Sequence, residues 1–113
     1  MAWWKPIPKI RVVSGLEDLP TDVKAYKRLP KNAETFYNKD TLPMGLLSRH
    51  NTRAGVWGKL QVVEGELLYK VLESLVVDYF LDSSNYAVIQ ALLYHTIKPL
   101  TDDLQFPLTF FKK

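Results

Sequence analysis

The alternation of apolar and polar residues is clearest in the middle of the chain. Residues 59–62 read Lys, Leu, Gln, Val, so Leu60 and Val62 alternate with polar neighbours at the period of two expected of a half-buried strand. Glu64 and Gly65 follow where a two-residue turn would lie, and residues 66–72 provide a return strand. The pattern predicts a β-hairpin over residues 56–72.

Short β-branched and aromatic runs continue to the C-terminus, at residues 76–81, 86–89, 95–100 and 106–111. Polar clusters at 38–40, 82–85 and 101–103 are typical of turns. Residues 75–81 also follow a three-to-four spacing that would suit a helix. Because short, turn-bounded runs at close spacing favour strands, we expect an all-β fold.

The first 32 residues have a different composition, with four of the seven prolines. We expect an extended N-terminal arm over residues 1–32, containing one short turn or helix for which Thr21 is a possible N-cap. Trp3 and Trp4 are expected to pack the arm onto the domain or onto a partner subunit, and stacking on a ligand is the alternative. Residues 33–113 then form the domain proper.

Composition limits the class of protein. A chain of 113 residues fits one domain, and 47% apolar with 24% charged residues is ordinary for a globular protein. The absence of cysteine excludes disulfides, thiolate catalysis and cysteine-bound zinc. The formal charge of +3 comes from scattered basic residues, so we expect no nucleic-acid binding. Without a signal-peptide core or an apolar run long enough for a membrane span, a cytoplasmic protein is the default.

Several segments together resemble a known family. The resemblance is carried by YKRLP from Tyr26, FYNKDTLP from Phe36, HNTRAGVWGKLQVVEGEL from His50 and YHTIKPLTDDLQFPLTFFKK from Tyr94. On these residues the chain resembles the cupin-like domain that stands at the N-terminus of long tellurite-resistance methyltransferases and occurs alone in YeaR-like proteins. The resemblance implies an all-β, cupin-like double-stranded β-helix, a jelly-roll barrel whose mouth can hold a small ligand or a metal.

The resemblance also implies a metal site built from two imidazoles on separate motifs. His50 and His95 are the only histidines, and both stand where the family carries one. Neutral imidazole binds a divalent transition metal such as zinc, iron or nickel. The fuller cupin pattern would add a second nearby histidine and a glutamate, but Asn51 and Thr52 follow His50. Glu64 and Glu66 lie at the predicted turn, where a solvated role is expected.

The segment before His95 departs further from the family pattern. Residues 90–93, Gln-Ala-Leu-Leu, replace a polar, proline-bearing loop, and Tyr94 stands where the family often has Trp. The alternative to a metal role is therefore that His50 hydrogen-bonds within a polar loop and that the backbone satisfies His95 at the edge of the core. No Gly-x-Ser-x-Gly elbow or phosphate-binding glycine loop is present, so no catalytic residue is assigned and the existence of an enzymatic activity stays open.

Two functions of different class follow. The first is a small metal- or ligand-binding domain linked to tellurite, other oxyanions or nitrosative stress. The second is a non-catalytic, homodimeric interaction module without metal, which docks through an apolar surface onto itself or a partner chain. The surface named by this second hypothesis comprises Trp3, Trp4, Leu92, Leu93, Phe110 and Phe111. A homodimer is expected under either hypothesis.

Overall fold

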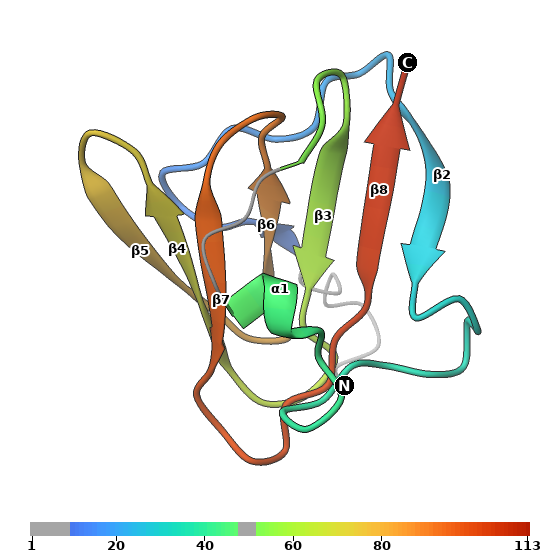
Figure 1. Ribbon diagram of the computed structural model, residues 1–113, viewed down its shortest axis with the longest axis vertical. Coiled ribbons are helices and arrows are strands. Elements are labelled where there is room, and N and C mark those ends of the chain that lie inside the picture. The colour runs from blue at the N-terminus through green and yellow to red at the C-terminus, as the bar shows by residue number, and fades with distance from the viewer. Residues whose placement is uncertain (1–9, 48–51) are drawn as a thin grey trace, which may run out of the picture.

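Eight strands and one short helix make up the described part of the chain (Figure 1). The computed structural model describes residues 10–47 and 52–113. The elements are β1 (Arg11–Val12), β2 (Lys24–Leu29), α1 (Met44–Leu47), β3 (Trp57–Gln61), β4 (Leu67–Leu72), β5 (Val76–Leu81), β6 (Asn85–Ile89), β7 (His95–Pro99) and β8 (Leu108–Lys112). The predicted all-β class is confirmed, with the four-residue α1 as an addition that the apolar pattern did not predict.

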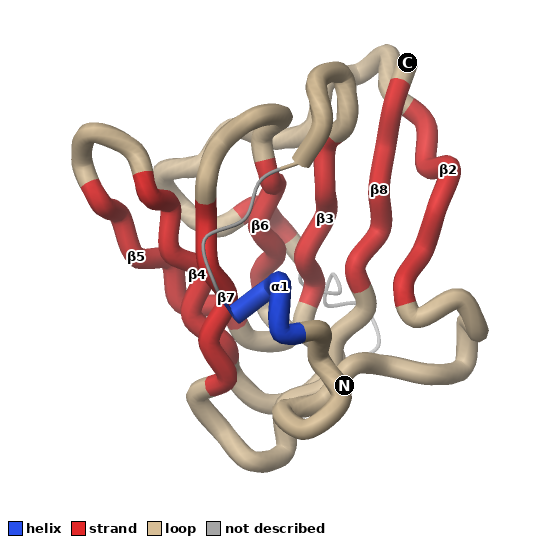
Figure 2. Tube along the Cα trace, in the orientation of Figure 1, coloured by secondary structure: helices blue, strands red, loops and turns tan. Residues whose placement is uncertain are grey.

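The strands form two sheets, which Figure 2 shows as two groups of red segments. One sheet has five strands in the order β1-β6-β3-β8-β2, and the other has three in the order β5-β4-β7. All neighbouring pairs are antiparallel except β1 with β6. Among the described strands, β1, β2, β5 and β7 end their sheets, so the predicted barrel is not closed by hydrogen bonds.

The strand boundaries in the second half of the chain match the apolar runs closely, but the predicted hairpin is wrong. β3 pairs with β6 and β8, whereas β4 pairs with β5 and β7 in the other sheet. Between them the chain crosses from one sheet to the other, where the backbones of Glu64 and Gln105 pair instead. Alternation identifies strands but not their partners, since both strands bury one face in the same core.

Gly65 makes this crossing possible. Its φ is +79°, a conformation that side chains with a Cβ rarely adopt. A Cβ there would lie 2.5 Å from Thr101 Oγ1 and 2.7 Å from the Cα of Leu104. The turn at residues 101–103, predicted from its polar residues, therefore packs directly against the backbone of the crossing.

The core lies between the sheets. β4 alternates strictly, with Leu67, Tyr69 and Val71 buried and the residues between them half-buried. From the five-stranded sheet the core receives chiefly Leu60, Ala87, Ile89 and Leu108. Two layers packed through their apolar faces are a standard way of building an all-β domain.

The segment expected to form an arm contributes strands where it is described. β1 pairs with β6, and β2 pairs with β8 through a register shift between Ala25 and Lys27. Of the turn and the helix expected near Thr21, the structure has the turn, since residues 21–22 form a turn that leads into β2. Trp3 and Trp4 lie outside the described residues. No helix in residues 10–47 or 52–113 is long and apolar enough to cross a membrane.

Candidate functional site

Of the two predicted metal-binding histidines, the structure places one. His50 lies outside the described residues. His95 begins β7 and is 1% exposed, which makes it one of the few polar side chains in the core. Its Nδ1 lies 3.1 Å from the backbone oxygen of Leu93. Since a carbonyl oxygen can only accept, Nδ1 carries the proton in this contact, and in the neutral ring the electron pair is then on Nε2.

Two tyrosines extend from His95 across the inner face of the three-stranded sheet. The ring centroids of His95 and Tyr69 are 5.5 Å apart, and those of Tyr69 and Tyr79 are 6.1 Å apart. Tyr79 is directly opposite Tyr69 in the strand register, and His95 is opposite Val71, two residues along β4. Burial, and then the nearby Tyr79, raises the pKa of Tyr69 well above its ordinary value of 10.0, so Tyr69 is neutral at physiological pH.

Thr52 connects the start of the motif segment to the loop before His95. It is 6% exposed, and its hydroxyl lies 3.0 Å from the oxygen of Val56 and 3.3 Å from that of Gln90. Its own backbone oxygen accepts a hydrogen bond from Leu92 N at 3.1 Å. The chain just after His50 and the chain just before His95 are therefore fastened together.

The loop from Gln90 to Tyr94 adopts a specific backbone conformation. Leu92 has a φ of +68°, which is unusual for a residue with a branched side chain, and its side chain is exposed. Leu93 N donates to Gln90 O, which closes a turn, and Tyr94 O accepts from Leu72 N at the end of β4. The apolar sequence that departs from the family pattern thus forms an ordered turn that presents His95 to the core.

The carboxylates considered as further ligands do not surround His95. Glu64 and Glu66 are both exposed in the chain crossing between β3 and β4. Within the described ranges, no group of three or more His, Asp or Glu side chains could hold a metal ion. The residues placed by the structure therefore do not fit a metal on their own, and the predicted site depends on His50.

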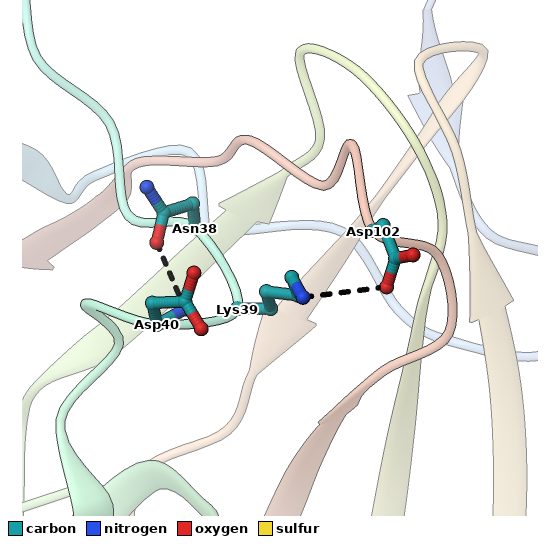
Figure 3. A network of polar contacts seen from close by, with 4 residues as sticks. All are labelled: Asn38, Lys39, Asp40 and Asp102. Carbon is teal, nitrogen blue, oxygen red and sulfur yellow. Dashed lines mark hydrogen bonds and ion pairs between the residues drawn. The ribbon is translucent and has the colours of Figure 1, made fainter.

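A polar network at another loop has a structural role (Figure 3). Asn38 Oδ1 accepts hydrogen bonds from the backbone N–H groups of Asp40 and Thr41, which forms the predicted turn. Lys39 Nζ lies 3.5 Å from Asp102 Oδ1, and both side chains are substantially exposed. These contacts fasten the loop before α1 to the turn after β7.

Sequence reasoning identified His95 but missed Thr52 and Tyr69 as its structural context. In the sequence, Thr52 is only part of the motif after His50, at a place where the fuller cupin pattern would have a second histidine nearby. Nothing in the sequence pointed to Tyr69, because its contact with His95 depends on the pairing of β4 with β7. The predicted hairpin instead paired β4 with β3.

Comparisons with known proteins agree with the fold. A family model described as the TehB-like domain matches residues 32–108. The probable S-adenosyl-L-methionine-dependent methyltransferase TehB of Haemophilus influenzae (strain Rd) is 30% identical over 99 residues, which cover 84% of this chain and 33% of that protein. The uncharacterized protein YeaR of Escherichia coli (strain K12) is 33% identical over 84 residues, which cover 67% of this chain and 71% of YeaR.

Solved structures show the same relationship. The crystal structure of TehB from Haemophilus influenzae superposes with a TM-score of 0.74 at 29% identity, covering 82% of this chain and 32% of that one. A crystal structure of an Escherichia coli (strain K12) protein gives a TM-score of 0.73 at 25% identity, covering 85% of this chain and 96% of that one. The chain spans about a third of the TehB proteins that it matches. With the family model matching more than half of its length, the chain belongs to the TehB-like family.

Proposed function

We propose that this chain is a cupin-like, small-ligand-binding domain with a jelly-roll arrangement of its two sheets, and that His95 contacts the ligand. The observation that carries the proposal is the imidazole of His95, buried in an otherwise apolar layer with Nδ1 held by Leu93 O. Fixing one ring nitrogen by a backbone carbonyl orients the other, and metal-ligating histidines are commonly held in this way.

The neighbouring residues support a binding site at this end of the sandwich. Thr52 and the turn before His95 meet there through the hydrogen bonds to Gln90 and Leu92, and α1 lies close to β7. Tyr69 and Tyr79 supply aromatic surface beside the imidazole. The ligand must be small, because His95 is almost completely enclosed.

The chemistry of Nε2 narrows the class of ligand. With Nδ1 protonated, the Nε2 electron pair can accept a hydrogen bond from the O–H group of a protonated oxyanion, or it can bind a transition-metal ion. We choose the oxyanion as the ligand class to test first. Tellurite is the first probe because the sequence resembles the N-terminal domain of tellurite-resistance methyltransferases. A role in stress protection and a cytoplasmic location are part of the same proposal.

A metal held by His50 and His95 stays a prediction. The hydrogen bonds of Thr52 support this prediction, because they join Thr52 to the turn just before His95. Thr52 is two residues from His50, a separation that an extended chain spans in about 7 Å. When bound, such a metal would supply a Lewis acid for an oxyanion oxygen. The methyltransferase activity named for TehB belongs to that longer protein and is not extended to this chain.

Two substitutions at position 95 test the proposal. His95→Asn keeps a donor near the position of Nδ1 but removes Nε2, whereas His95→Gln places an amide near Nε2 and loses the Nδ1 donor. Isothermal titration calorimetry with sodium tellurite should show binding to the wild type and none to His95→Asn, while circular dichroism confirms that the variant is folded. Sodium sulfate serves as the control anion.

Metal analysis of the purified proteins distinguishes the metal hypothesis from the oxyanion hypothesis. Mass-spectrometric metal analysis after incubation with Zn²⁺ or Ni²⁺ should find one ion per chain in the wild type, lost in both His50→Ala and His95→Asn, if the two histidines share a metal. Unchanged metal content in both variants contradicts that hypothesis. Tellurite binding that is equal in the wild type and His95→Asn, or absent from both, contradicts the proposed function.

A further inference from the structure

Basic residues that are far apart in the sequence come together where β2 pairs with β8. Residues 24–31 and 112–113 contain six Lys or Arg residues and no Asp or Glu. Since the chain has fifteen Lys and Arg residues, the other nine are outnumbered by its twelve Asp and Glu residues. The net positive charge of the chain therefore comes from these two segments, and Figure 1 shows β2 on the opposite side of the molecule from β5.

Three lysines of these segments share one face of the two strands. Lys24 is directly opposite Lys112 in the strand register. Lys27 is opposite Phe110, which precedes Lys112 by two residues. Because side chains alternate between the two faces along a strand, all three lysines lie on the same face. They are also exposed, and we call Lys24, Lys27 and Lys112 the lysine face.

The charge of the lysine face is not neutralised by carboxylates. Like charges directly opposite each other on paired strands destabilise a sheet, as Lys24 and Lys112 do here. Within residues 10–47 and 52–113, none of the three lysines forms an ion pair. The nearby carboxylate of Asp22 lies 3.4 Å from Nζ of Lys113 instead. The lysine face can therefore attract an anionic partner.

Aromatic rings lie beside two of these lysines. Nζ of Lys27 is 5.9 Å from the ring centroid of Phe110, and Nζ of Lys112 is 4.5 Å from that of Tyr26. Phe110 is half-buried and packs against the core, whereas Tyr26 is 39% exposed. Positive charge and an accessible aromatic ring are thus combined on one surface.

The composition of this surface favours a phosphate backbone over an acidic protein. Lysine is depleted from protein–protein interfaces, whereas lysines neutralise phosphates in nucleic-acid binding without sequence specificity. Arginine is the residue that binds carboxylates through two parallel hydrogen bonds, but the Arg28 guanidinium already donates to the backbone oxygens of Asn32 and Thr35. An acidic peptide could add a strand to β2, but the register shift between Ala25 and Lys27 disrupts that edge.

We propose that the lysine face and Tyr26 bind single-stranded nucleic acid without sequence specificity. The lysines contact phosphates, and the ring of Tyr26 stacks on a base, which is accessible in a single strand but not inside a duplex. The expectation of no nucleic-acid binding rests on basic residues that are scattered in the sequence, and the pairing of β2 with β8 removes that basis.

Fluorescence anisotropy with a labelled oligothymidylate of about twelve nucleotides tests this proposal. The wild type should bind saturably at about 50 mM NaCl, and log K should fall with log salt with a slope of about −2, as three lysine–phosphate contacts predict. Lys24→Glu should weaken binding by about tenfold or more, because one phosphate contact is lost and a repulsive charge is added. Lys98→Glu, which makes the same charge change at an exposed residue of β7, should leave binding unchanged.

Two substitutions at position 26 test the role of the ring. Tyr26→Ala should weaken binding by about fivefold or more, whereas Tyr26→Phe should retain it. Circular dichroism verifies that each variant is folded. Equal binding by Tyr26→Ala and the wild type would contradict the stacking contact.

Three further results overturn the proposal. They are the absence of saturable binding to the wild type, equal weakening by Lys24→Glu and Lys98→Glu, and tighter binding of a duplex of the same length. Displacement of the oligonucleotide by poly-L-glutamate at the same concentration of charge points to an acidic protein partner and also overturns it. Since His95 is on β7 in the other sheet, His95→Asn should bind the oligonucleotide like the wild type. Failure here is therefore distinguishable from failure of tellurite binding.

Discussion

Thr52 and Gln90 are joined by a hydrogen bond across 38 positions of sequence, with the Thr52 hydroxyl 3.3 Å from the Gln90 carbonyl oxygen. The same hydroxyl lies 3.0 Å from Val56 O, so its one proton is shared between two carbonyl oxygens. Together with the bond from Leu92 N to Thr52 O, this arrangement holds the turn before His95 in place. The position of the candidate ligand-binding imidazole thus depends on a buried threonine in another part of the chain.

Removing the Thr52 hydroxyl should loosen that turn. Thr52→Val should lower the free energy of unfolding by about 1–3 kcal/mol, because two partly buried carbonyl groups lose a donor. Thr52→Ser, which keeps the hydroxyl, should cost less. Urea unfolding measures both, and amide hydrogen exchange at Leu92 should accelerate in Thr52→Val. Equal stability of the two variants would show that the hydroxyl is not important.

Gly65 should tolerate no side chain. Gly65→Ala forces a Cβ against Thr101 and Leu104 at a positive φ, so we expect a loss of about 2–4 kcal/mol in the free energy of unfolding. Gly45→Ala is the control, since a Cβ there meets nothing within 4 Å. Comparable effects at both positions in chemical denaturation would mean that the crossing between the sheets is not as tight as the structure shows.

Alkaline pH should destabilise the fold through Tyr69. Its folded-state pKa is raised above 10.0, mainly by burial, so the unfolded chain releases the phenol proton at lower pH than the folded chain. The stability that the neutral Tyr69 side chain contributes is fully present below pH 10, and it is lost as the pH rises above 10. Tyr69→Phe should therefore show a shallower fall in melting temperature between pH 9 and 11. Parallel profiles for wild type and variant would exclude Tyr69 as the cause.

The loop network of Figure 3 should depend on Asn38 more than on the ion pair. Asn38→Ala removes the acceptor for two backbone N–H groups and should cost about 1 kcal/mol of unfolding free energy, whereas Asn38→Asp retains the acceptor. Lys39→Ala should cost less, about 0–1 kcal/mol, because the pair with Asp102 is exposed. A larger loss from Lys39→Ala in thermal unfolding contradicts this ranking.

The sequence predicted individual strands much better than it predicted their partners. The run at 76–81 matches β5 in both bounds, since turn residues flank it and its own composition is rich in β-branched and aromatic residues. The hairpin of β3 with β4 failed because either strand can present an apolar face to a shared core, and the pairing of Glu64 with Gln105 has no local signal. β2 was missed because solvent-exposed Lys and Tyr residues interrupt any apolar alternation.

The candidate site was predictable only in part, because the sequence does not show which strands pair with each other. His95 stood out as one of two histidines in a recognisable motif, whereas its neighbour Tyr69 depends on the pairing of β4 with β7. The burial of Thr52 follows from its contact with a turn 38 positions away. His50 stays a predicted partner, to be placed by experiment.

The most direct test of the proposed binding role is a long-range ¹H–¹⁵N NMR spectrum of the histidine rings, recorded with and without sodium tellurite. We expect the ring of His95 to carry a proton on Nδ1, and its Nε2 resonance to move on tellurite addition while sulfate leaves it unchanged. An Nε2 resonance that shows a bound proton in the free protein, or that does not respond to tellurite, would contradict a ligand-binding role for His95.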